Sequence, residues 1–71
     1  MTRAEALAEA RRLLGARATV WEHRRIGGLR IPEPYCIGTL HGHGGGFRIV
    51  SGRGDSWELA LADTARHEAQ P

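Results

Sequence analysis

The chain contains no lysine, one cysteine and few aromatic residues, and these shortages exclude several classes of protein. Because Cys36 has no second cysteine to pair with, the disulfide-stapled scaffolds typical of small secreted proteins are excluded. No window approaches the ~18 consecutive apolar residues of a membrane span, and residues 1–5 do not lead into the apolar segment of a secretory signal. We therefore expect a cytoplasmic protein that does not enter a membrane.

The length of 71 residues suits one small domain and is too short for two, so residues 1–71 are interpreted as a single domain. A core of this size supplies only about 3–5 kcal/mol of stability, a shortage that a partner or a second copy would relieve. All ten basic residues are Arg, against eight acidic residues, which leaves a formal charge of +2. The charge is nearly balanced overall, so its distribution along the chain is more informative than its sum.

The N-terminal segment predicts a helix over residues 3–14. Thr2 and Glu5 form a capping box, in which each side chain can accept the backbone N–H of the other residue. Apolar residues recur at helical spacing after it, as at Leu7 and Leu14. Gly15 follows at the position where a helix commonly ends.

The middle of the chain predicts an antiparallel sheet. Runs of β-branched and aromatic residues, separated by Gly and Pro, indicate strands over residues 18–26, 35–41 and 46–51. Gly27 and Gly28 are candidates for a two-residue hairpin turn, and residues 41–46 connect the last two strands. Successive side chains alternate between faces, so Trp21 faces away from the helices if Val20 faces them.

The last segment predicts a second helix over residues 56–68. Asp55 is predicted to accept the first backbone N–H groups of this helix, and Glu58 to stabilise its positive end. The fold class is therefore α+β, in the order α-β-β-β-α. A three-stranded antiparallel sheet is covered on one face by two helices, and its other face is left open.

This order of elements resembles the double-stranded RNA-binding domain in topology. Such domains place a Lys-rich cluster at the N-terminus of the second helix, where it contacts phosphates, but this chain has Asp55 and Glu58 there. Residues 52–63, a Gly-rich strand end followed by an acidic cap and an Ala/Leu helix, also look like the closing half of small phage and antitoxin-type proteins.

An arginine-rich hairpin is the first candidate binding site. Three arginines surround Gly27–Gly28, and the adjoining open sheet face would present Trp21 and His23; the arginines are Arg24, Arg25 and Arg30. Arginine pairs bidentately with carboxylate or phosphate and is enriched at interfaces. The alternative is that these arginines are only solvent-exposed charges at the ends of the strands, where they protect the sheet edge from pairing.

His41 and His43 form a second candidate, with Arg48 as a further contact residue. In an extended segment the two histidines point the same way, a spacing that metal sites use, but a stable site needs a third ligand. His43 with Arg48 loosely resembles the active site of a small nuclease toxin. No Ser or Cys lies in an activating motif, so we expect no catalytic residue, metal or cofactor.

The sequence therefore favours a non-enzymatic interaction protein. Its expected role is that of a small adaptor or inhibitor encoded by a phage or mobile element, and it binds an acidic surface on a host protein. Its size is similar to that of anti-CRISPR proteins, which are inhibitors of this kind. The second hypothesis is a nucleic-acid-binding module, and the third is a His-dependent nuclease toxin. Dimerisation through the uncovered sheet face is a further possibility.

Overall fold

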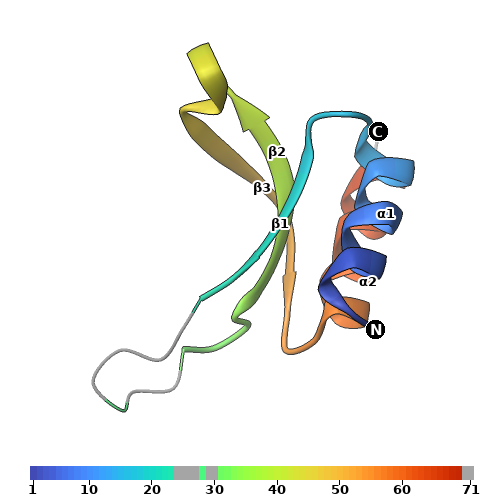
Figure 1. The fold of residues 1–71 in the computed structure, drawn as a ribbon. Helices are drawn as coiled ribbons and strands as arrows, with labels where there is room; N and C mark the ends of the chain where they lie inside the picture. The colour runs from blue at the N-terminus through green and yellow to red at the C-terminus, as the bar shows by residue number, and fades with distance from the viewer. Residues whose placement is uncertain (24–27, 29–30, 70–71) are drawn as a thin grey trace.

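The structure, a computed structural model, describes residues 1–23, 28 and 31–69. The elements follow one another as α1 (Arg3–Leu14), β1 (Ala18–Glu22), β2 (Tyr35–His41), the short 3-10 helix η1 (His43–Gly45), β3 (Phe47–Gly54) and α2 (Trp57–Ala69) (Figure 1). The three strands form one antiparallel sheet in the order β1-β2-β3. The predicted fold class, α+β in the order α-β-β-β-α, is confirmed.

Helix α1 begins and ends where its local signals predict. The Thr2 hydroxyl accepts the backbone N–H of Glu5 at 3.1 Å, and the Glu5 carboxylate accepts that of Thr2 at 2.9 Å. Hydrogen bonds from Thr2 lower the pKa of Glu5, because they stabilise the charged carboxylate. Gly15 ends the helix at a φ of 88°, a value that favours glycine.

Two strand boundaries differ from the prediction. Strand β1 ends at Glu22, and His23 lies beyond it, although its N–H still donates to the carbonyl of Pro34 at 2.9 Å. The rest of the predicted strand, residues 24–26, lies outside the described residues. Strand β3 begins at Phe47 and continues to Gly54, and Ser51 is an extra residue in its ladder, because Gly38 pairs with Val50 whereas the preceding Ile37 pairs with Gly52.

Both helices cover the same face of the sheet (Figure 1). The core between them consists of small and branched side chains, with Trp57 as its one large aromatic residue: Ala6, Ala10, Ala18, Val20, Ile37, Trp57, Ala60 and Leu61. Tyr35 meets Trp57 edge to face at a centroid distance of 4.7 Å. Alanine and glycine allow a close approach between α2 and β3, where a Cβ on Gly52 would lie 2.5 Å from the backbone nitrogen of Thr64.

Helix α2 starts one residue later than predicted, and its cap is a different residue. Ser56, not Asp55, accepts a helical N–H, that of Leu59, at 3.1 Å. Asp55 instead accepts the backbone N–H of Glu33 at 3.1 Å, so it fastens the segment before β2 to the end of β3. The prediction that Asp55 caps the helix was wrong, because Ser56 is the capping residue and Oδ1 of Asp55 bonds to a donor from a distant segment.

The start of α2 is also connected to the N-terminus of the chain. The Glu58 carboxylate lies 3.1 Å from the N-terminal ammonium of Met1. Its own backbone N–H, together with that ammonium, lowers the pKa of Glu58. Within the described residues, no helix is both long and apolar enough to cross a bilayer.

Candidate binding face of the sheet

The sheet face that the helices leave uncovered forms the candidate site. The cross-strand register places one set of residues from all three strands on this face, which we call the open face: Thr19, Trp21, Cys36, Gly38, Leu40, Arg48, Val50 and Arg53. The opposite set, which includes Val20 and Ile37, lies in the core. Trp21 therefore faces away from the helices, as the alternation of β1 predicts.

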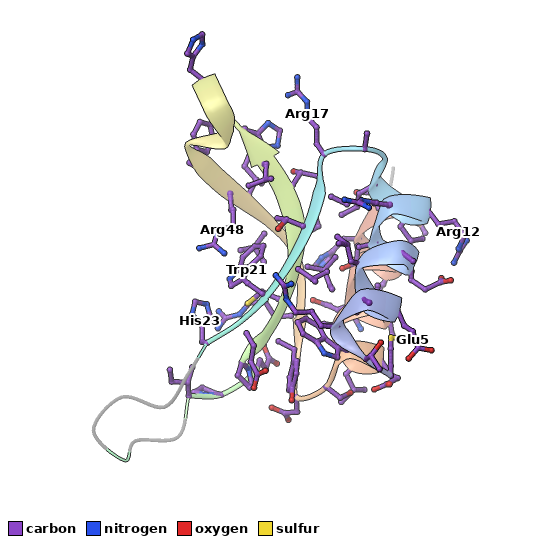
Figure 2. All side chains as sticks on the ribbon, in the orientation of Figure 1. Glu5, Arg12, Arg17, Trp21, His23 and Arg48 are labelled. Atoms are coloured by element: carbon purple, nitrogen blue, oxygen red, sulfur yellow. The ribbon has the colours of Figure 1, made fainter. Side chains whose placement is uncertain are left out.

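Trp21 and Arg48 meet across the central strand. The guanidinium carbon of Arg48, on β3, lies 4.5 Å from the centroid of the Trp21 ring, on β1 (Figure 2). The contact depends on Gly38, because a Cβ there would lie only 3.0 Å from Cη2 of the indole. Glycine on β2 thus leaves the indole room to lie across the strand and to form a cation–π contact with an arginine two strands away.

Cys36 lies next to Trp21 on the neighbouring strand and is unreactive. It is fully buried although it belongs to the open face, and its cross-strand partners are Trp21 and Arg53. Burial raises the pKa of the Cys36 thiol, and the charge of Arg53 opposes that effect only in part. The thiol therefore stays protonated near neutral pH, donates weakly to the carbonyl of Pro34 at 3.8 Å, and acts as a small apolar side chain.

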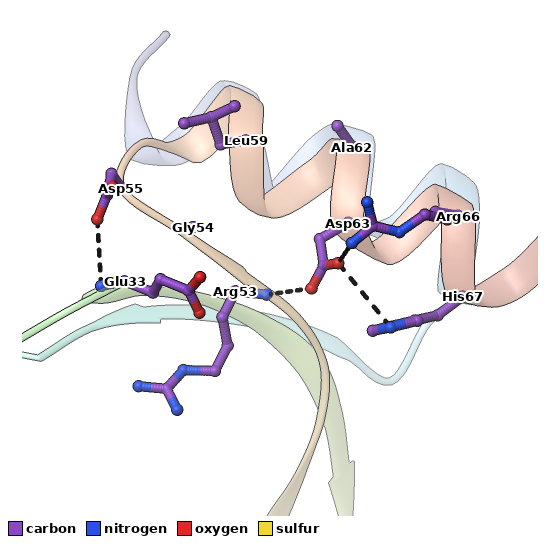
Figure 3. A pocket seen from close by; sticks show the side chains of 9 residues that line it. All are labelled: Glu33, Arg53, Gly54, Asp55, Leu59, Ala62, Asp63, Arg66 and His67. Atoms are coloured by element: carbon purple, nitrogen blue, oxygen red, sulfur yellow. Dashed lines mark hydrogen bonds and ion pairs between the residues drawn. The ribbon is translucent and has the colours of Figure 1, made fainter.

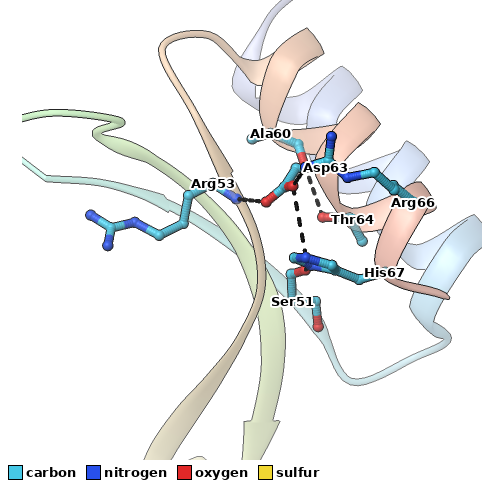
Figure 4. A network of polar contacts seen from close by, with 7 residues as sticks. All are labelled: Ser51, Arg53, Ala60, Asp63, Thr64, Arg66 and His67. Atoms are coloured by element: carbon cyan, nitrogen blue, oxygen red, sulfur yellow. Dashed lines mark hydrogen bonds and ion pairs between the residues drawn. The ribbon is translucent and has the colours of Figure 1, made fainter. Parts of the chain in front are cut away.

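The charge of the open face is positive. Arg48 and Arg53 are both exposed, and among the described residues neither guanidinium lies within 4.0 Å of a carboxylate. Figure 4 shows the Arg53 side chain directed away from α2, on the side of the sheet opposite the helices. The face therefore combines an indole, apolar residues and two guanidinium groups that are available to acidic groups of another molecule.

The structure brings together some of the residues predicted from sequence. Trp21 and Arg48 are in contact, and His23 lies exposed just beyond the end of β1 on the same side (Figure 2). The arginines predicted to form the hairpin lie outside the described residues, as does the predicted Gly27–Gly28 turn: Arg24, Arg25 and Arg30. Their contribution to the site stays a prediction.

His41 and His43, the second candidate from the sequence, do not lie in one extended segment. His41 stacks on Phe47 at a centroid distance of 5.8 Å and lies 2.7 Å from the Thr39 hydroxyl. Gly42, at a φ of 83°, turns the chain, so His43 lies in η1 rather than in an extended strand. The extended segment on which the expectation of a shared direction depended is therefore interrupted between the two histidines. No cluster of three or more metal-ligating side chains is found within residues 1–23, 28 and 31–69.

Sequence reasoning missed a polar network between α2 and β3. The Asp63 carboxylate accepts the backbone N–H of Arg53 at 3.0 Å, pairs with the guanidinium of Arg66, and lies 3.9 Å from Nε2 of His67 (Figure 4). The Arg53 N–H, followed by His67 and Arg66, lowers the pKa of Asp63. His67 Nδ1 lies 2.7 Å from the Ser51 carbonyl, which can only accept, so Nδ1 donates. The i, i+3, i+4 spacing of the three side chains was the available signal.

This network forms one wall of an open depression of about 480 Å³ at the junction of α2 and β3 (Figure 3). The Asp63, Arg66 and His67 side chains in this wall bond to one another or to the backbone of β3, so they already have a structural role in holding α2 to the strand. The open face is the better candidate site on geometry.

Comparisons with protein-family models, with curated proteins and with solved structures find no match to this chain.

Proposed function

We propose that this protein is a non-enzymatic binding protein whose open face docks on an acidic surface of another protein. The observation that supports this most directly is the Trp21–Arg48 pair, an exposed guanidinium held over an indole on the uncovered face of the sheet. Tryptophan and arginine are the residues most enriched at the energetic centre of protein interfaces. Leu40 and Val50 surround the pair with exposed apolar area on the same face.

The reactive groups of the described residues favour binding over catalysis. The Cys36 thiol is buried and protonated, so it is a poor nucleophile. His67 is engaged with the Ser51 carbonyl, and Asp63 with a backbone N–H and a guanidinium. Both side chains therefore serve to hold α2 against β3, which is a structural role.

The distribution of charge favours a protein partner over nucleic acid. At the start of α2, where a double-stranded RNA-binding domain contacts phosphates, this protein has the exposed carboxylates Asp55 and Glu58. The open face interleaves two arginines with apolar side chains and is not a continuous basic stripe. Arg24, Arg25 and Arg30 adjoin this face in the sequence and, in this proposal, extend it.

An adaptor or inhibitor role fits such a surface. A protein that only binds needs no deep pocket, and 71 residues are enough to present three strands to a partner. In this proposal the protein acts in the cytoplasm, where its single thiol stays reduced, and it belongs to the small phage or mobile-element proteins that block a host complex.

Charge reversal on the open face tests this function. The tagged protein is used to capture partners from host lysate, and Arg48→Glu with Arg53→Glu is expected to abolish recovery of a defined protein partner. Arg12→Glu is the matched control, because Arg12 is also exposed but lies on α1, on the far side of the molecule (Figure 2). Recovery that survives the double reversal would contradict the proposal.

Two further arms separate the hairpin and the nucleic-acid hypothesis. Arg24→Glu with Arg25→Glu tests the hairpin by itself, and unchanged recovery would remove it from the binding surface. Heterogeneous RNA and DNA are titrated by fluorescence anisotropy at several salt concentrations. Binding that weakens steeply with salt and is lost in Arg48→Glu would favour nucleic acid as the partner, because phosphate contacts release counterions.

A further inference from the structure

Strand β3 is an edge strand, and only part of its edge is covered. At its C-terminal part, α2 supplies partners for the outward backbone groups: Asp63 accepts the N–H of Arg53, and His67 donates to the carbonyl of Ser51 (Figure 4). At its N-terminal part, residues 47–50, the β2–β3 hairpin extends beyond the helices (Figure 1), and all four residues are exposed. The uncovered half of the edge is therefore four residues long.

The hydrogen-bond pattern shows which backbone groups point outward there. On β2, Leu40 donates to the carbonyl of Arg17, which lies just before β1, so the even-numbered residues of β2 bond towards β1. The odd-numbered residues Thr39 and His41 bond towards β3, where their partners are Ile49 and Phe47. The N–H and C=O groups of Arg48 and Val50 therefore point to the outer edge.

The other edge of the sheet, on β1, is also partly covered. On β1, the carbonyl of Val20 accepts the guanidinium of Arg3 at 3.2 Å. The N–H of Ala18 donates to the carbonyl of Gly15 at 3.1 Å. Both groups point away from β2, so α1 and the turn after it each supply a partner for one outward backbone group of the β1 edge.

The side chains on the uncovered half of β3 are apolar. Phe47, Ile49 and Val50 are 55%, 49% and 48% exposed, which is unusual for large hydrophobic residues so close together. Edge strands are normally protected by an outward charge, and the one charge here is Arg48. Its guanidinium lies over Trp21, across the sheet, so it does not block the edge.

We propose that a second copy of this chain pairs with β3 along this edge, antiparallel, with Ile49 opposite Ile49 of the second copy. This register places Arg48 opposite Val50 of the other chain on both sides of the two-fold axis. Each of these two pairs exchanges two hydrogen bonds, because the groups of both residues point outward. Phe47 and Ile49 of both chains gather on one face, where they bury apolar area that is exposed in the monomer.

Neighbouring registers are less favourable. An axis at Arg48 would place two guanidinium groups directly opposite each other, and like charges in that position destabilise strand pairing. An axis at Val50 would move the pairing further into the covered part of the strand and place Phe47 opposite Arg53, whose outward N–H already bonds to Asp63. Pairing about Ile49 therefore makes a six-stranded sheet in which the open faces of both copies are adjacent.

The oligomeric state and one charge substitution test this dimer. Sedimentation equilibrium of the full chain, up to concentrations of about 100 μM, is expected to give twice the monomer mass of 7.8 kDa. Ile49→Lys is expected to give a monomer with an unchanged circular dichroism spectrum. Leu59→Lys is the matched control, because Leu59 is 56% exposed on α2 and should leave the dimer intact. A monomer at every concentration would overturn the proposal, as would equal effects of the two substitutions.

Cysteine cross-linking tests the register directly. Residues opposite each other without mutual hydrogen bonds lie about 4.5 Å apart between Cα atoms, within reach of a disulfide. Ile49→Cys, mildly oxidised with glutathione disulfide, is therefore expected to form a covalent dimer. Arg48→Cys alone should not, but Arg48→Cys mixed with Val50→Cys should form the heterodimer. The native Cys36 is buried and does not interfere. Absence of the Ile49 cross-link, or efficient self-linking of the Arg48 variant, would refute the register.

Discussion

Substitution of Gly52 by alanine should be among the most damaging single-methyl changes in this protein. Gly52 lies on β3 directly beneath α2. A Cβ there would be 2.5 Å from the backbone nitrogen of Thr64, 2.7 Å from the carbonyl oxygen of Ala60, and in contact with the Thr64 hydroxyl. Two of these atoms belong to the helix backbone, so no side-chain rotation can relieve the clash. The helix itself has to move.

The magnitude follows from the distance that α2 must move. Ordinary contacts of a Cβ begin near 3.4 Å, so relief requires a displacement of about 1 Å, and a gap of that size forfeits about a quarter to a half of the dispersion energy across it. Trp57, Ala60 and Leu61 all pack across this interface. We expect Gly52→Ala to cost about 3 kcal/mol, the upper end of overpacking costs, out of a total stability of about 4–10 kcal/mol for 71 residues.

Urea denaturation followed by circular dichroism measures this loss. Gly46→Ala is the matched control, because Gly46 has a φ of −66° and its nearest atom to a Cβ is 3.5 Å away. That substitution should change the free energy of unfolding by less than about 0.5 kcal/mol, or raise it slightly by restricting the unfolded chain. A loss below about 1 kcal/mol for Gly52→Ala would refute the close docking of α2 on β3.

Three further predictions concern the polar and thiol groups. Asp63→Asn should lower the free energy of unfolding by about 1 kcal/mol at pH 7. The hydrogen bond from the Arg53 N–H lowers the pKa of Asp63 in the folded protein, so the stability that the charged carboxylate contributes is present at neutral pH and is lost as the pH falls through the folded pKa. Thermal melts of the two proteins should therefore differ at pH 7 and converge in acid. Ser56→Ala should lower the free energy of unfolding by about 1 kcal/mol and reduce the helix content of α2, measured by far-ultraviolet circular dichroism. Asp55→Ala should leave that helix content unchanged. A loss of helix in the Asp55 variant and none in the Ser56 variant would show that Asp55 is the cap. Iodoacetamide should alkylate Cys36 at least about tenfold more slowly in the native protein than in urea, and equal rates would show that the thiol is accessible.

Much of the fold was predictable because its signals are local. The Thr2–Glu5 capping box lies within one turn of helix, so both partners are visible in the sequence. The alternation that separates Val20 from Trp21 is likewise a property of any extended strand. These features need no knowledge of what packs against them.

The composition of the candidate site was only partly predictable. Trp21 could be assigned to the open face from its parity with Val20, but nothing in the sequence indicates that Arg48, twenty-seven positions later, lies over its ring. That contact needs the register of three strands and the absence of a side chain at Gly38. The expectation that His41 and His43 share one extended segment failed for the converse reason, since the turn at Gly42 ends the strand between them.

By itself, the sequence determined the kinds and order of the elements, because hydrophobic periodicity, caps and turn residues act over a few positions. Only the tertiary structure decided how the polar groups are used. The position of Asp55 would allow it to cap α2, yet its carboxylate accepts the backbone N–H of Glu33, which comes from a distant segment. The sequence indicates that Asp63 is a solvated residue on a helix, yet its carboxylate accepts the outward backbone N–H of Arg53 on β3. Donors and acceptors bond to whichever partner the folded chain brings within about 3 Å, and that proximity is a property of the whole fold.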